Sequence, residues 1–238
     1  MLILLSPAKT FARTIVPFET RPIFINDALS LISKLRLFSV ATFVNKMKIS
    51  KNLAIQVHHD YQTFDLNPSC AIYAYAGYLY KGLDINHFDE ESLDYLKSHL
   101  YILSGLYGIV RPFDGISFYR LEIKDKIIRD LYAYWKPKIK KYLKKHHSDE
   151  ILINLASMEY SKVLHHHLNV ITISFFEIID GKPRAISMHI KMMRGKMARY
   201  LITQKIDSLA QIKSVIIDDY YFDAAKSTPK EYVFIKRS

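Results

Sequence analysis

Short apolar runs alternate with amphipathic stretches along the whole chain. Residues 2–5 are uninterrupted apolar side chains that stop at Ser6-Pro7, and such a run predicts a buried strand. Further apolar runs predict strands at residues 100–104, 151–155, 170–179 and 231–236. Apolar positions with helical spacing predict helices at residues 26–38, 39–46, 50–60, 89–97, 136–146 and 191–204, with Asn26 and Ser50 as N-caps. The aromatic stretch 71–80 fits neither period, and Gly181-Lys-Pro183 predicts a hairpin turn between 170–179 and 184–190.

These elements indicate one mixed domain over residues 1–238. The chain is 50% hydrophobic, which is enough for one sizeable core, and its 7 Gly and 8 Pro are scattered without forming a linker. Strands and helices follow one another without regular βαβ alternation. We therefore expect an α+β fold in preference to a doubly wound sheet.

The ends and the single cysteine bear on location. Met1 to Pro7 is apolar but short and has no basic stretch before it, so it indicates a strand and not a signal peptide. Apolar runs stay well below the roughly 18 residues that a membrane span takes. Cys70 is the only cysteine, which excludes an intramolecular disulfide. We expect a cytoplasmic protein with no membrane partner.

The charge balance points to an anionic partner. Lys and Arg number 34 against 23 Asp and Glu, a net charge of +11 with a pI near 9.5. A positive field of this size attracts polyanions, and nucleic acid ranks ahead of an anionic membrane surface. A lysine-rich composition with no such role is the alternative.

The segment 191–199 is the strongest candidate for phosphate contact. At about 100° per residue, Lys191, Arg194 and Arg199 fall within roughly 140° of one helix face. Gly195 lies inside that arc and disfavours helix, so it implies a packing or close-approach reason, and a phosphate backbone pressed against the helix would be one such reason. The alternative is a solvated amphipathic helix.

A glycine-rich hairpin, Ser104-Gly-Leu-Tyr-Gly108, follows the predicted strand 100–104. Its backbone N–H groups could face a phosphate, with Arg111 and Arg120 adding charge. It resembles the hairpin of helix-hairpin-helix proteins, although Gly105 and Gly108 are separated by two residues in place of one. A simple strand-end turn is the alternative.

Polar side chains follow two of the predicted strands, residues 2–5 and residues 151–155. Ser6 and Lys9 follow residues 2–5, and Lys9 suits a phosphate. Asn154 and Ser157 end the strand 151–155 and are candidates for a polar pocket, although Ser157 could simply cap a helix.

Acid–base and metal chemistry have weaker signals. Glu122 and Glu159 are the candidates for a general acid/base pair, should the protein be an enzyme. The histidines come in consecutive runs at 58–59, 146–147 and 165–167, and consecutive side chains point apart. We therefore expect no metal site and no cofactor.

Several segments together resemble the YaaA family. They run in order from end to end: Leu4-Leu-Ser-Pro-Ala-Lys-Thr10, Leu103-Ser-Gly-Leu-Tyr-Gly-Ile-Val-Arg-Pro112, Tyr119-Arg-Leu-Glu122, Asn154-Leu-Ala-Ser-Met-Glu-Tyr160, Lys191-Met-Met-Arg-Gly-Lys-Met-Ala-Arg199, Tyr221-Phe222 and Val233-Phe-Ile-Lys236. No single motif is specific, but the combination is.

The resemblance implies a cytoplasmic protein of the hydrogen peroxide stress response, associated with lowering free iron and with DNA binding. It implies a single α+β domain with a basic cleft and a helix-hairpin-helix-like element. We expect a monomer that grips the phosphate backbone of double-stranded DNA with little sequence preference. An enzyme that acts on a nucleotide, a nucleobase or a flipped base in the same cleft is the alternative.

Overall fold

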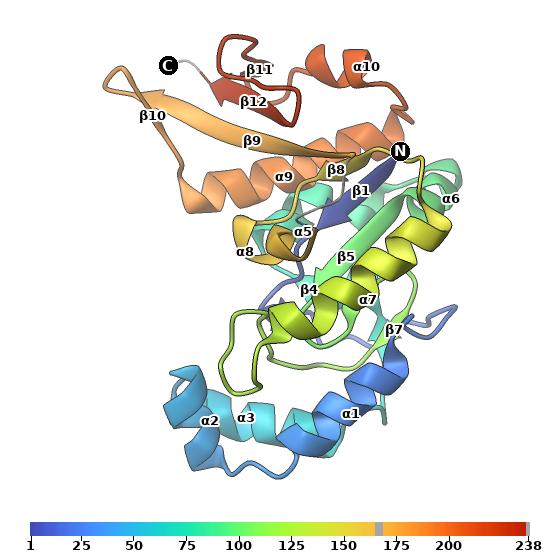
Figure 1. The fold of residues 1–238 in the computed structure, drawn as a ribbon, viewed down its shortest axis with the longest axis vertical. Helices are drawn as coiled ribbons and strands as arrows, with labels where there is room; N and C mark the ends of the chain where they lie inside the picture. Colours follow the sequence, from blue (N-terminus) through green and yellow to red (C-terminus); the bar gives the residue numbers. More distant parts are fainter. Residues whose placement is uncertain (165–168, 237–238) are drawn as a thin grey trace.

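The computed structural model describes residues 1–164 and 169–236, and its centre is an 8-stranded sheet (Figure 1). The strands run in the order β11-β12-β9-β8-β1-β5-β6, and β10 pairs with β9. Their bounds are β1 (Leu2–Leu5), β5 (Leu100–Ser104), β6 (Gly108–Val110), β8 (Leu152–Asn154), β9 (Val170–Ile179), β10 (Lys182–Arg184), β11 (Tyr220–Phe222) and β12 (Glu231–Lys236).

The middle of this sheet is parallel. β1 pairs in parallel with β5 and β8, β8 with β9, and β9 with β12, while β6, β10 and β11 pair antiparallel at the margins. The fold is therefore mixed α/β with a mostly parallel sheet, so the expected single mixture of strands and helices is confirmed, while the parallel middle of the sheet was not expected. Residues 6–99 separate β1 from β5 and hold several helices and small strands, which hides the βαβ alternation in the sequence.

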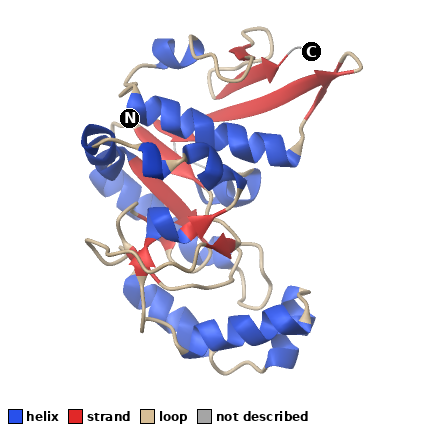
Figure 2. Cartoon of the chain, turned by 180° about the vertical axis from the view of Figure 1, so that it is seen from behind, coloured by secondary structure: helices blue, strands red, loops and turns tan. Residues whose placement is uncertain are grey.

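Helices cover both faces of the sheet (Figures 1 and 2). The α5, α6 and α9 helices lie on one face, α7 and α8 on the other, and α1 to α3 pack together at one end. The bounds are α1 (Ile25–Leu35), α2 (Val40–Met47), α3 (Lys51–Gln62), α4 (Ala71–Ala74), α5 (Tyr78–Leu83), α6 (Glu90–His99), α7 (Leu131–His146), α8 (Met158–Ser161), α9 (Ser187–Thr203) and α10 (Leu209–Lys213), with 3₁₀ turns at Ile85–His87 and Lys162–Leu164. Small strands pair outside the main sheet: β2 (Thr10–Phe11) with β4 (Tyr75–Ala76), and β3 (Ser69–Cys70) with β7 (Gly115–Ile116). In the described part of the chain, no helix has both the length and the apolar character needed to cross a bilayer.

Local sequence signals located most of these elements. The predicted strands 2–5, 100–104, 170–179 and 231–236 match β1, β5, β9 and β12. Ser50 caps α3 as predicted, because its hydroxyl accepts a hydrogen bond from the Leu53 N–H. Asn26 is not a cap, because α1 begins one residue before it. The α7 helix also begins earlier than predicted, at Leu131, where the Asp130 carboxylate caps the first turn.

The glycine hairpin is a buried β-hairpin, which corrects the expectation of a helix-hairpin-helix-like element. Ser104 pairs with Gly108 at the end of the antiparallel β5–β6 ladder, and residues 104–110 are all buried. Gly108 has φ +72° and lies against the Trp135 ring, while the Trp135 indole N–H donates to the Gly105 carbonyl at 2.8 Å. The hairpin is packed into the core, so its amides are not open to a phosphate.

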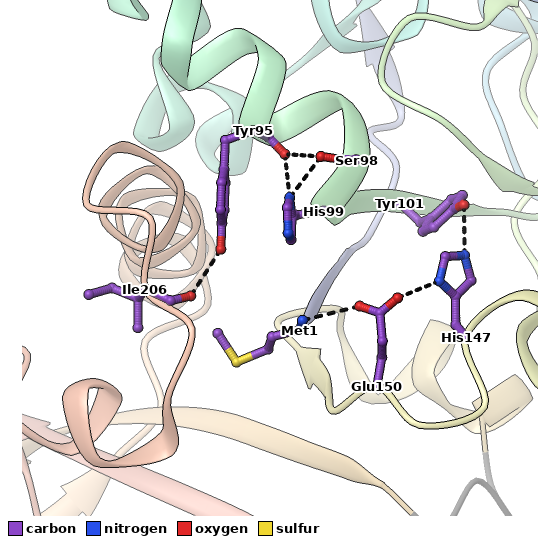
Figure 3. A network of polar contacts seen from close by, with 8 residues as sticks. All are labelled: Met1, Tyr95, Ser98, His99, Tyr101, His147, Glu150 and Ile206. Atoms are coloured by element: carbon purple, nitrogen blue, oxygen red, sulfur yellow. Dashed lines mark hydrogen bonds and ion pairs between the residues drawn. The ribbon is translucent and has the colours of Figure 1, made fainter.

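A polar network fastens the amino-terminal edge of the sheet (Figure 3). Glu150 precedes β8 and pairs with the Met1 ammonium at 3.1 Å and with His147 Nδ1 at 2.8 Å. The other ring nitrogen of His147 lies 3.0 Å from the Tyr101 hydroxyl on β5. The hydrogen bonds to His147 and Met1 outweigh the effect of burial, so the pKa of Glu150 is lowered. This network joins three parallel strands at the edge opposite the candidate site.

Candidate anion-binding cavity

The strand order places a crevice at the carboxyl ends of β1 and β8. The chain goes from β1 to β5 on one side and later returns to β8 and β9 on the other side of β1. In open parallel sheets, ligands bind where the strand order reverses in this way. Ser6 follows β1 and Ser157 follows β8, and the Ser157 N–H donates to the Ser6 hydroxyl at 2.8 Å.

A cavity of about 460 Å³ lies at this crevice. Four separate parts of the chain and helix α9 supply its walls. The lining residues are Ser6, Pro7, Ala8, Lys9, Thr10, Ala76, Gly77, Tyr78, Leu79, Tyr80, Tyr119, Arg120, Leu121, Glu122, Lys124, Ser157, Glu159, Tyr160, Lys191 and Arg194. Because these segments are far apart in sequence, only the folded chain makes the site.

The cavity is net positive. Five basic side chains line it against two carboxylates, Glu122 and Glu159. The basic residues are Lys9, Arg120, Lys124, Lys191 and Arg194. The convergence expected from the sequence is thus seen for Lys9, Arg120, Lys191 and Arg194, and the pocket residues Ser6 and Ser157 join them.

The two carboxylates are linked through one lysine. Lys124 Nζ lies 2.8 Å from Glu159 Oε2 and 3.4 Å from Glu122 Oε2, and Lys9 Nζ lies 2.6 Å from Glu122 Oε1. Burial raises the pKa of Glu122, whereas the hydrogen bonds and charges of Lys9 and Lys124 lower it. The effect of the two lysines is the larger, so the pKa of Glu122 is below its ordinary value. The hydrogen bond to Glu159 is the main cause that raises the pKa of Lys124. The network therefore holds Glu122 ionised.

Asp125 lies just behind this network. Burial is the main cause that raises its pKa, and the charge of Glu122 acts in the same direction. Its carboxylate accepts a hydrogen bond from the Glu122 N–H at 2.8 Å. Sequence reasoning missed both Lys124 and Asp125, because neither lies in a recognisable motif; their closeness to Glu122 in the chain was the available signal.

Arg194 has no partner in the described part of the chain. It extends from α9 to the cavity, and its Nε is buried without a hydrogen bond. Burial alone lowers the pKa of its guanidinium. Glu159 Oε1 is likewise buried without a partner in the part described, while Oε2 binds Lys124.

Close helix packing sets the place of Arg194. A Cβ atom on the next residue, Gly195, would clash with the Leu79 carbonyl oxygen on α5. The glycine is required for contact between two helix backbones. The expectation that Gly195 has a packing or close-approach reason is therefore confirmed, and the group that approaches it is the α5 backbone and not a phosphate, while Arg194 beside it lines the cavity.

Other predicted residues lie elsewhere. Arg111 binds the buried Asp114 carboxylate at 2.9 Å and the Arg21 carbonyl at 2.7 Å, so it fastens a loop. Arg199 pairs with Asp84 at 2.5 Å. Asn154 is buried in the strand end, where its side chain binds Thr172 and the Ala156 N–H.

No cysteine or histidine is among the described residues that line the cavity. Burial raises the pKa of the Cys70 thiol to about 11, so a peroxide-reactive thiolate is disfavoured. Within residues 1–164 and 169–236, no group of three or more His, Cys, Asp or Glu side chains could hold a metal ion. The run His165-His166-His167 lies outside the described residues.

Comparison with known proteins identifies the family. The profile of a family described as peroxide stress protein YaaA matches residues 1–226. A UPF0246 protein of Finegoldia magna is 36% identical over 244 residues, covering 99% of this chain and 98% of that protein. A UPF0246 protein of Legionella pneumophila is 36% identical over 255 residues, with 99% of each chain covered, and one of Burkholderia ambifaria is 37% identical over 257 residues, with 100% of this chain and 99% of the relative covered.

The site thus belongs to an α/β protein with a positively charged cavity at the switch point of its sheet. The chain belongs to the peroxide stress protein YaaA family. That family description connects the fold with the peroxide stress response.

Proposed function

We propose that this protein acts in the peroxide stress response by binding nucleic acid, with double-stranded DNA as the first candidate, through phosphate contacts around the cavity. The observation that carries the proposal is the convergence of Lys9, Arg120, Lys191 and Arg194 from separate segments. A cationic surface that served solubility alone would have no reason to gather them. Lysine offers a point charge and arginine a two-pronged grip on phosphate oxygens.

We expect these side chains to contact the phosphate backbone of the nucleic acid and not the edges of its bases. Lys9 and Lys191 are exposed, so they can reach phosphates without entering a groove. Binding of this kind carries little sequence information. In this proposal, any effect on free iron and any protection from Fenton chemistry follow from nucleic-acid binding, and the chain works as a cytoplasmic monomer without a cofactor.

Salt dependence tests the proposal. Fluorescence anisotropy with labelled duplexes of several sequences should give affinities within a few-fold, and log K should fall linearly with log salt, by roughly 0.9 per phosphate contacted. The double variant Arg120→Ala with Lys191→Ala should weaken binding to all duplexes alike. It should also reduce the slope of log K against log salt by about two units, one for each phosphate contact removed. Arg199→Ala is the matched control, because Arg199 lies on the same helix as Lys191 but is paired with Asp84. Salt-independent binding, or a strong preference for one sequence, would contradict the proposal.

A second candidate is an enzyme acting on a nucleotide or base in the cavity. Glu122 and Glu159 favour it, because both carboxylates line a concave site beside unpaired cations. Ion pairing with Lys9 and Lys124 lowers the pKa of Glu122 and makes it a weak base. Incubation with nucleosides, nucleotides and single-stranded DNA, followed by mass analysis, tests it: a product lost in Glu159→Gln supports the enzyme.

A further inference from the structure

Two buried side-chain atoms lack a hydrogen bond within the described residues, and both belong to residues that line the same cavity. They are Arg194 Nε and Glu159 Oε1. Buried polar atoms are almost always satisfied, so each such atom asks for an explanation. Because both residues line one cavity, a single ligand bound there would account for the two atoms together.

The arginine defines the charge of the ligand. The Arg194 side chain is partly buried, and a cation taken out of water without a partner is costly. The backbone contact between Gly195 and α5 keeps the start of the Arg194 side chain at this depth. An anion in the cavity would pair with the guanidinium, and the planar fork fits the two oxygens of a phosphate.

The glutamate defines a second feature. Glu159 Oε2 accepts a hydrogen bond from the Lys124 ammonium, and the second oxygen of a carboxylate paired in this way accepts a hydrogen bond from a donor. The ligand must therefore carry a hydrogen-bond donor as well as an anion. A nucleobase N–H or a ribose hydroxyl supplies one.

The walls of the cavity limit the size and shape of the ligand. Aromatic side chains at Tyr78, Tyr80, Tyr119 and Tyr160 line the cavity together with Leu79 and Leu121. A volume of about 460 Å³ is in the range of small-molecule sites and is too small for a duplex. Flat aromatic bases pack on such side chains.

We infer that the cavity binds a single nucleotide, free or everted from a strand, with its phosphate on Arg194 and a base or sugar donor on Glu159. This inference rests on the proposed function for the choice of nucleic acid as the wider partner, and it goes beyond backbone binding because it assigns the cavity to one nucleotide unit. Arg194 and Glu159 are binding residues in it.

Calorimetric titration tests the inference with the four deoxynucleoside 5′-monophosphates, the matching nucleosides and inorganic phosphate. At least one monophosphate should bind ten or more times more tightly than its nucleoside or inorganic phosphate. Arg194→Ala should weaken that binding at least tenfold and Glu159→Gln several-fold, while Arg199→Ala leaves it unchanged. Arg194→Lys keeps the charge and serves as a second variant if the alanine variant unfolds; loss of the fork should still weaken binding.

Two results separate this inference from the proposed function. If no monophosphate binds better than inorganic phosphate, or if Arg194→Ala and Arg194→Lys both bind like Arg199→Ala, the pocket inference is overturned, although salt-dependent duplex binding can still hold. If a monophosphate binds as expected but duplex and single-stranded DNA do not compete for it, the nucleotide pocket stands and the DNA-binding proposal fails.

Discussion

Gly82 on α5 and Gly195 on α9 face each other where the two helices cross. A Cβ atom on Gly82 would clash with the Met192 carbonyl oxygen, and one on Gly195 would clash with the Leu79 carbonyl oxygen. The helix backbones are therefore in direct contact. This contact fixes Arg194, the residue before Gly195, beside the tyrosines at the start of α5 that line the cavity.

Gly195→Ala should destabilise the protein. Alanine favours an ordinary helix by about 1 kcal/mol, but here its methyl group must push α5 away, and overpacking costs about 1–3 kcal/mol. We expect urea unfolding to show a lower free energy of unfolding. Lys191→Ala, at an exposed position on the same helix, is the control. A stabilised Gly195→Ala variant would show that the two helices are not in backbone contact.

Cys70 should resist modification in the folded protein. With a pKa of about 11, only about one thiol in a thousand is ionised at pH 8, and the side chain is buried. Iodoacetamide and dilute hydrogen peroxide should react with it far more slowly in buffer than in urea, and the rate in buffer should rise with pH. Mass spectrometry over time measures this. Equal rates in buffer and urea would contradict the assigned environment and revive a thiol-based peroxide chemistry.

Glu122 should make stability depend on pH in acid. Its pKa is lowered in the folded state, so the stability it adds is fully present above its unfolded pKa, near 4.5, and is lost as pH falls through the lower folded value. Thermal unfolding should show Glu122→Gln less stable than wild type at pH 7, with the difference shrinking below about pH 4. Glu91→Gln removes an exposed ion pair with Lys205 and should change little at either pH. A constant difference between wild type and Glu122→Gln from pH 7 to pH 3 would count against the ion-pair network.

Protein purified without a histidine tag should carry no stoichiometric iron or zinc. The paired histidines diverge by local geometry, and the described residues hold no cluster of three or more suitable ligands. Metal analysis after dialysis measures this directly. One equivalent of iron or zinc that survives dialysis would contradict the prediction and draw attention to the His165-His166-His167 run.

Local patterns in the sequence determined the elements. The apolar runs at 2–5 and 170–179 located β1 and β9 to the residue, and the Ser50 hydroxyl marked the start of α3. These signals depend on neighbours a few residues apart, which is why a single sequence contains them. The excess of basic residues likewise predicted a positive site.

Tertiary structure decided the sheet and the partners of each charge. The parallel pairing of β1 with β5 places Ile3 opposite Leu100, and no local pattern encodes a pairing between residues so far apart in the sequence. Arg194 and Arg199 look alike in sequence, yet Arg199 meets Asp84 while Arg194 is left unpaired at the cavity. Which cation is free for a ligand depends on which carboxylate the fold brings near, and that is a property of distances in space and not of spacing along the chain.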